Sequence, residues 1–144
     1  MCDCSRRWFL TLAGAGVAGG IFARQAGAAQ ADAAKFIKAA FAMKAKAIAS
    51  GDQPYGAVLV MDNEIIGWGP SRVVLDNNED AHAERVSMWD AQKRRGNMDL
   101  TGAALYSTSI PCSHCQDFAA RHGVAKMIHG RGMLDAGRPR RYGE

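Results

Sequence analysis

Two short stretches of the sequence, His82-Ala83-Glu84 and Pro111-Cys112-Ser113-His114-Cys115, bring metal-binding residue types together with one free carboxylate. Each stretch opens a predicted helix, over residues 82–95 and 112–122. Cysteine thiolates and imidazole are preferred zinc ligands, and a zinc site with three protein ligands keeps its fourth position open for water. The two stretches therefore predict a catalytic zinc site at the point where two helices begin.

The spacing of these residues suits such a site. Cys112 and Cys115 are expected to project from one side of a helix, and the helix N-terminus is expected to lower the pKa of both thiols. His82 supplies the third ligand, and Glu84 is expected to reach the open side and move protons. The alternatives are a Cys112–Cys115 disulfide, a purely structural zinc site, and a Glu84 carboxylate that only complements the helix dipole.

The remaining pattern alternates helices with strands. A helix is predicted over residues 32–50, and the four predicted strands cover residues 55–61, 64–69, 103–108 and 124–129. Strands that alternate with helices form one sheet covered on both faces. We therefore expect an α/β fold, a three-layer α-β-α domain, with an irregular segment over residues 130–144 and a shortened C-terminus.

The first 28 residues resemble an export signal. The pair Arg6-Arg7 precedes an uncharged run over residues 8–23 and a small-residue site at Ala26-Gly27-Ala28. The alternative, a membrane anchor, needs about 20 apolar residues, and this run is shorter and rich in glycine. We predict a twin-arginine signal peptide over residues 1–28, a single globular domain over residues 29–144, and a periplasmic location. The location is cytoplasmic if the leader interpretation is wrong.

Length and composition point to one globular domain. The chain has 144 residues, of which 48% are hydrophobic and 22% charged, with a formal net charge of +4. This composition excludes a disordered chain or a disulfide scaffold. Basic residues exceed acidic ones within the predicted leader, so the remainder is nearly neutral and no nucleic-acid partner is expected. The predicted leader also holds Cys2 and Cys4, which leaves Cys112 and Cys115 in the domain.

Three stretches carry a family resemblance: residues 54–58 (Pro-Tyr-Gly-Ala-Val), residues 77–84 and residues 105–115. Together they resemble the cytidine deaminase-like superfamily, and within it the guanine deaminases and tRNA adenosine deaminases. The resemblance implies that residues 29–144 form a CMP/dCMP-type deaminase domain in which His82, Cys112 and Cys115 bind zinc. It also implies that Glu84 takes a proton from the attacking water and delivers it to the ring and the leaving amine, and that the backbone N–H of Ala83 binds the oxygen at the reacting carbon.

The resemblance implies hydrolytic deamination of a free nucleobase or nucleoside, a purine such as guanine or adenosine being favoured, with release of ammonia. Zn²⁺ is the only cofactor expected, and the partner is a small molecule. A tRNA substrate is not expected, because the predicted leader directs the chain away from tRNA. The alternatives are a cytosine or cytidine deaminase, and a non-catalytic zinc-stabilised binding protein with an incomplete pocket. A homodimer is expected.

The chain departs from the family pattern at the positions expected to contact substrate. Ser71 stands where many purine-type members carry an asparagine, and Ile110 replaces an acidic residue before the Pro-Cys pair. Ser71, Asn77 and Asp135 are the candidate substrate contacts. Tyr142 is a candidate lid residue in the short C-terminal segment.

Overall fold

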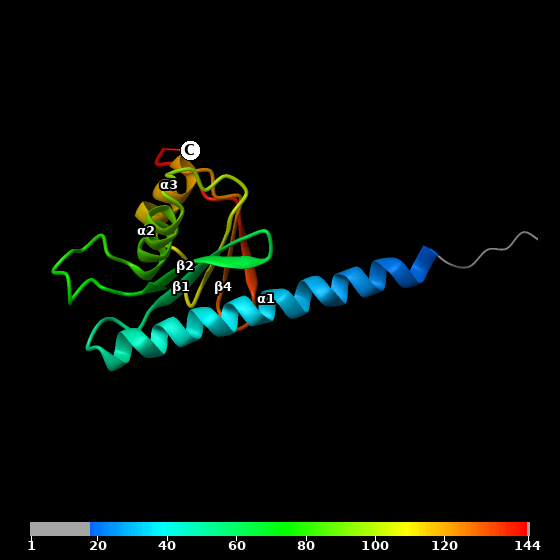
Figure 1. The fold of residues 1–144 in the computed structure, drawn as a ribbon, viewed down its shortest axis with the longest axis horizontal. Helices are drawn as coiled ribbons and strands as arrows, with labels where there is room; N and C mark the ends of the chain where they lie inside the picture. The colour runs from blue at the N-terminus through cyan, green and yellow to red at the C-terminus, as the bar shows by residue number, and fades with distance from the viewer. Residues whose placement is uncertain (1–17, 144) are drawn as a thin grey trace, which may run out of the picture.

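The computed structural model describes residues 18–143 (Figure 1). Its elements, in chain order, are α1 (Ala18–Ala49), β1 (Gly56–Met61), β2 (Glu64–Pro70), α2 (Ala83–Arg95), β3 (Ala104–Ser107), α3 (Ser113–Arg121), β4 (Lys126–His129) and β5 (Leu134–Gly137). The Arg6-Arg7 pair lies outside the described residues, so the leader and its cleavage stay predictions. None of the helices described here combines the length and the apolar character needed to cross a membrane.

The five strands form one mixed sheet in the order β2-β1-β3-β4-β5. Strand β1 pairs antiparallel with both β2 and β3, and β3 pairs parallel with β4 through the crossover helix α3. The registers Gly56↔Pro70 and Ala57↔Ser107 bring the start of β1 and the ends of β2 and β3 to the same edge of the sheet. The loops that leave this edge lead into α2 and α3.

Helices cover both faces of the sheet, which makes three layers (Figure 1). Because successive side chains of a strand point to opposite faces, Ala57 and Leu59 face one core while Val58 and Val60 face the other. The first core packs against α2 and α3. The second packs against Phe36 and the rest of the buried stripe of α1. The predicted three-layer α-β-α fold is confirmed.

Glycines let α2 lie close to the sheet. A Cβ at Gly69 of β2 would overlap the carbonyl oxygen of Ala83, and a Cβ at Gly67 would overlap that of Ser87. The Gly67-Trp68-Gly69 sequence therefore fixes the distance between β2 and the first turns of α2. That distance sets the position of His82 and Glu84 relative to the edge of the sheet.

The structure differs from the sequence prediction at both ends. Helix α1 begins at Ala18 and not at residue 32, and it runs through the site at which cleavage was predicted. The segment after residue 130 was expected to be irregular, but Leu134–Gly137 forms β5, which pairs antiparallel with β4. Gly130 and Met133 adopt positive φ angles in the turn between the two strands. With this turn, β4 and β5 form a hairpin. The glycine and arginine content of the segment had predicted a loop.

Candidate metal and catalytic site

The site lies at the edge of the sheet where α2 and α3 begin. His82 is the N-cap of α2, and Cys112 is the N-cap of α3, each with extended backbone geometry. The His82 side chain makes no capping hydrogen bond, so its ring is available to turn toward α3. The Cys115 N–H donates to Cys112 Sγ over 3.3 Å, which holds the first thiol above the first turn of α3. The prediction that both cysteines lie within the helix is therefore wrong for Cys112.

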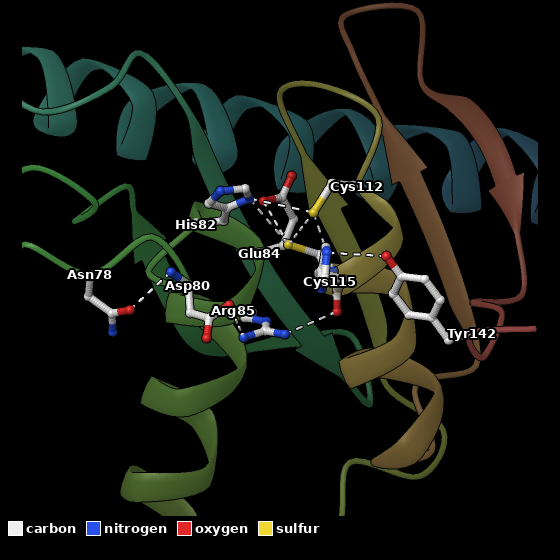
Figure 2. Close-up of polar contacts among 9 residues, drawn as sticks. Asn78, Asp80, His82, Glu84, Arg85, Cys112, Cys115 and Tyr142 are labelled. Atoms are coloured by element: carbon white, nitrogen blue, oxygen red, sulfur yellow. Dashed lines mark hydrogen bonds and ion pairs between the residues drawn. The ribbon is translucent and has the colours of Figure 1, made fainter.

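The two caps bring one nitrogen and two sulfurs together (Figure 2). His82 Nδ1 lies 3.5 Å from Cys112 Sγ and 3.6 Å from Cys115 Sγ. The two sulfurs are 3.2 Å apart and both cysteines are free, so the disulfide alternative is not the arrangement found.

These separations fit a zinc ion. Tetrahedral zinc with ordinary bond lengths separates a bound nitrogen from a bound sulfur by about 3.6 Å and two bound sulfurs by about 3.8 Å. Both nitrogen–sulfur distances match, and a small χ1 rotation of either cysteine would open the sulfur pair by the difference. His82, Cys112 and Cys115 would hold the ion. Three protein ligands are the number typical of a catalytic zinc site.

The pKa of Cys115 corrects one prediction. Burial raises the pKa of this thiol, and the neighbouring Glu84 carboxylate and Cys112 thiol act in the same direction. The sequence predicted that the helix N-terminus would lower the pKa of both thiols. For Cys115 this prediction is wrong, because burial outweighs the effect of the helix N-terminus. Because a thiol binds zinc as the thiolate, a zinc ion held here would displace the proton of Cys115.

Among the residues that the structure describes, Glu84 is the one carboxylate buried beside the three ligands. It lies in the first turn of α2 and is 5% exposed, and Cys115 Sγ donates to its Oε2 at 3.9 Å. Burial raises the pKa of Glu84 to about 7. A group with a pKa near neutrality is well suited to accept and then release a proton. Ala83, the first residue of α2, is fully buried behind it, and a backbone N–H at this position has no partner within the helix.

Two cavities reach the ligand cluster, and both are lined by Gln53 and His82. The first, of about 510 Å³, is polar, with Glu79, Asp80, Arg85 and His114 in its wall. The second, of about 410 Å³, is lined by Tyr55, Glu84, Ser109, Ile110 and Cys112. Both volumes are in the range of small-molecule sites. Since Glu84 faces the second cavity, that cavity is where a reacting group would meet the carboxylate.

The three candidate substrate contacts lie elsewhere among the described residues. Ser71 is 1% exposed and its hydroxyl donates to Asp52. Asn77 is exposed in the loop before α2, in a left-handed conformation with φ 45°. Asp135 lies on β5, where it forms a 3.0 Å ion pair with Lys126. None of the three lines either cavity.

Gln53 and Arg85 are two of the cavity-wall residues that the sequence analysis did not indicate. Gln53 carries no motif, and only its place before the start of β1 could have indicated it. Arg85 directly follows Glu84, and its guanidinium pairs with Asp80 at 2.6 Å and donates to the His114 carbonyl at 3.3 Å (Figure 2). A cation after the His-x-Glu motif is the signal that could have been used. His114 lines the polar cavity, and its Nε2 lies 3.1 Å from the Tyr142 hydroxyl.

Comparison with known proteins agrees with this geometry. Residues 30–131 match the family model described as the cytidine and deoxycytidylate deaminase zinc-binding region. The tRNA-specific adenosine deaminase of Bacillus subtilis is 35% identical over 95 residues, which are 66% of this chain and 59% of that protein. The guanine deaminase of Bacillus subtilis is 35% identical over 81 residues, which are 56% of this chain and 52% of that protein.

Solved structures show the same fold. The crystal structure of the Bacillus subtilis guanine deaminase has a TM-score of 0.63 and 29% identity, and the match covers 67% of this chain and 62% of that one. A structure from a study of A-to-I editing by tRNA:A34 deaminases has a TM-score of 0.64 and 29% identity, covering 66% and 73%. The chain spans 49% to 62% of the length of curated relatives of this kind.

The fold and the site together define an α/β domain in which a histidine and two cysteines at the start of two helices could hold a metal ion. The chain belongs to the family that contains the cytidine and deoxycytidylate deaminase zinc-binding region.

Proposed function

We propose that this protein is a zinc-dependent hydrolase that deaminates a free nucleobase or nucleoside, with purines favoured. The observation that carries the proposal is Glu84, a buried carboxylate with a pKa raised to about 7, beside the His82, Cys112 and Cys115 cluster and facing a cavity of about 410 Å³. The similarity to guanine deaminase and to tRNA-specific adenosine deaminases supports the reaction class.

Bound zinc supplies the Lewis acidity that makes water a nucleophile near neutral pH. Glu84 accepts the proton of the attacking water and passes it to a ring nitrogen and then to the departing amine. The backbone N–H of Ala83 orients the oxygen that forms at the reacting carbon. Tyr55 and Ile110 give the cavity apolar walls against which a flat heterocycle packs. The amine leaves as ammonia and the ring gains a carbonyl.

A test of this proposal measures ammonia released by zinc-loaded protein from guanine, adenine, cytosine and their nucleosides, with Glu84→Gln beside it. Turnover that is lost in the variant supports the assignment. Turnover of cytosine or cytidine alone would establish the pyrimidine alternative. A protein that holds one zinc, binds a base and releases no ammonia would be the non-catalytic binding protein.

Adenosine in tRNA is a second candidate substrate. The similarity to tRNA-specific enzymes supports it, and so does a polar cavity beside α3 that is lined by Arg138, Arg140 and Arg141. Arginine side chains are well suited to contact phosphates. An anticodon stem-loop with adenosine at the first anticodon position belongs in the same assay. Inosine formed there, with no turnover of free bases, would replace the free-base proposal.

The location of the protein rests on its first 28 residues. We propose export through the twin-arginine leader, which would separate the enzyme from tRNA. Replacing Arg6-Arg7 by Lys-Lys should retain the protein in the cytoplasm, as measured by fractionation and blotting. Unchanged export would contradict the leader interpretation and would remove the argument against a tRNA substrate. The homodimer stays a prediction, to be checked by light scattering.

A further inference from the structure

The residue expected to read the substrate, Ser71, is turned away from both cavities. Its hydroxyl donates to Asp52 Oδ1 over 2.8 Å, and its N–H donates to the Tyr55 carbonyl over 3.1 Å. With 1% of its surface exposed, Ser71 has no path to a ligand in either cavity. A different polar group must therefore distinguish one heterocycle from another.

Gln53 is the neutral polar side chain that lies between the two cavities. It is half-buried and lines both of them, a property it shares only with His82 among the lining residues. Within the part of the chain that the structure describes, its carboxamide has no hydrogen-bond partner. A carboxamide offers a carbonyl acceptor and two N–H donors in one plane. Gln53 is thus able to receive a ligand edge that both donates and accepts.

The preceding residue, Asp52, fixes the backbone of Gln53. Oδ1 of Asp52 accepts from the Gln53 N–H at 2.7 Å as well as from Ser71. Oδ2 accepts from the Val74 and Leu75 N–H groups at 3.0 and 2.9 Å. Asp52 is 9% exposed, and both of its oxygens are occupied. One buried carboxylate therefore joins Gln53 to the loop over residues 71–75, and Val73 of that loop lines the polar cavity.

We infer that Gln53 is the specificity-determining residue, that it binds the lactam edge of an amino-oxo base, and that Asp52 is its positioning residue. This inference rests on the proposed deaminase function. The amine that reacts must face Glu84, so it is not available to Gln53. A ring N–H beside a ring C=O presents one donor and one acceptor, which match the oxygen and the N–H of a carboxamide in a two-point contact. Guanine carries such an edge next to its amine.

Two ligands that differ only at this edge test the inference. Guanine and 2-aminopurine share the same amine, but only guanine carries the lactam. Their dissociation constants are measured on the full, zinc-loaded chain with Glu84→Gln, which blocks turnover. We expect guanine to bind about 10- to 100-fold more tightly, the range for one or two neutral hydrogen bonds with a buried partner. Gln53→Met, which keeps the length of the side chain, should remove this preference and leave 2-aminopurine binding unchanged.

Asp52→Asn should reduce the guanine preference through misplacement of Gln53, whereas Ser71→Ala should keep it, since the Ser71 hydroxyl contacts only Asp52. The ratio of the two dissociation constants is the readout, because a general loss of stability would weaken both ligands alike. Zinc content and circular dichroism check that each variant folds. If Gln53→Met does not fold, Gln53→Glu replaces it and should lower guanine affinity, because a carboxylate cannot donate to the ring carbonyl.

Equal affinity for guanine and 2-aminopurine, or a guanine preference that survives in Gln53→Met, would overturn the inference. Its failure is distinguishable from failure of the proposed function. Binding of guanine that depends on Gln53, without ammonia release by the parent protein, would leave the inference standing and reject the deaminase. Turnover of guanine by the parent protein, with the preference for guanine over 2-aminopurine unchanged in the Gln53 variants, would support the deaminase and reject the inference about Gln53.

Discussion

The two walls of the site are built differently. The wall of His82, Glu84, Cys112 and Cys115 comes from the first residues of two helices, and each pair lies within four positions in the sequence. The second wall is formed by Gln53 and Val73, and Asp52 behind them holds it through contacts with residues about 20 positions away. Local geometry places the side chains within each pair of the first wall, and the packing of the two helices on the sheet brings the pairs together. In the second wall, tertiary contacts place the side chains themselves. The chemistry of the reaction and the choice of substrate therefore depend on different kinds of interaction.

The largest effect is expected from loss of a ligand. Cys115→Ser should lower zinc content from about one ion per chain to a small fraction, because two remaining ligands bind zinc far more weakly. Activity should fall with it. Metal analysis and ammonia release on the same preparation provide the measurement. His122→Asn, a change at the C-cap of α3 where the ring contacts the Met98 carbonyl, is the matched control and should keep both.

Glu84→Gln should separate metal binding from turnover. Zinc content should stay near one per chain, while kcat falls by about 10²- to 10⁴-fold, the range for removal of a general acid–base group. Glu64→Gln, at an exposed carboxylate at the start of β2, is the control and should change kcat little. Activity retained in Glu84→Gln would show that this carboxylate does not transfer the proton. The first wall would then no longer be the wall that carries the chemistry.

A change in the second wall should alter the free energy of unfolding of the protein and the dependence of that free energy on pH. Burial opposes ionisation of Asp52, but hydrogen bonds from Leu75, Ser71, Gln53 and Val74 together hold its pKa below the usual value. A lowered folded-state pKa stabilises the protein above the unfolded-state pKa of about 3.9, and this contribution disappears as the pH falls through the folded-state value.

Asp52→Asn should therefore lower the free energy of unfolding at pH 7 by about 1–3 kcal/mol, because it leaves buried donors facing an amide N–H₂. The difference from the parent protein should shrink below pH 4. Urea unfolding at several pH values measures it, with Ser71→Ala, which removes one donor, as the milder comparison. A difference that does not change with pH would show that the charge of Asp52 is not what holds this wall together.

The smallest effect is expected away from both walls. Asp135 and Lys126 are about half exposed, and their ion pair joins β4 to β5. Asp135→Asn should change the free energy of unfolding little, because exposed ion pairs contribute little, and it should leave kcat/KM unchanged. A large loss of kcat/KM would restore Asp135 as a substrate contact and would extend the second wall to the C-terminal hairpin.

The same contrast explains what the sequence could predict. The zinc ligands and Glu84 follow from short spacings, because the start of a helix places such side chains whatever else surrounds them. The direction of Ser71 could not be predicted, since it depends on a buried carboxylate at residue 52 that carries no motif. The β5 strand was missed because Leu134–Gly137 pairs through a turn with positive φ angles, and its own residues have little strand character. The role of Gln53 could not be predicted either, because it depends on the position of this side chain between two cavities.

Hydrolytic deamination at the His82, Cys112 and Cys115 cluster transfers an oxygen atom from water to the base, so the fate of water oxygen distinguishes it from binding alone. Zinc-loaded protein is incubated with guanine in water enriched in oxygen-18, and ammonia and the purine product are measured together. We expect equal amounts of ammonia and of an oxo product that carries one labelled oxygen at the former amine position. A protein that binds zinc and guanine yet yields neither ammonia nor labelled product would contradict it.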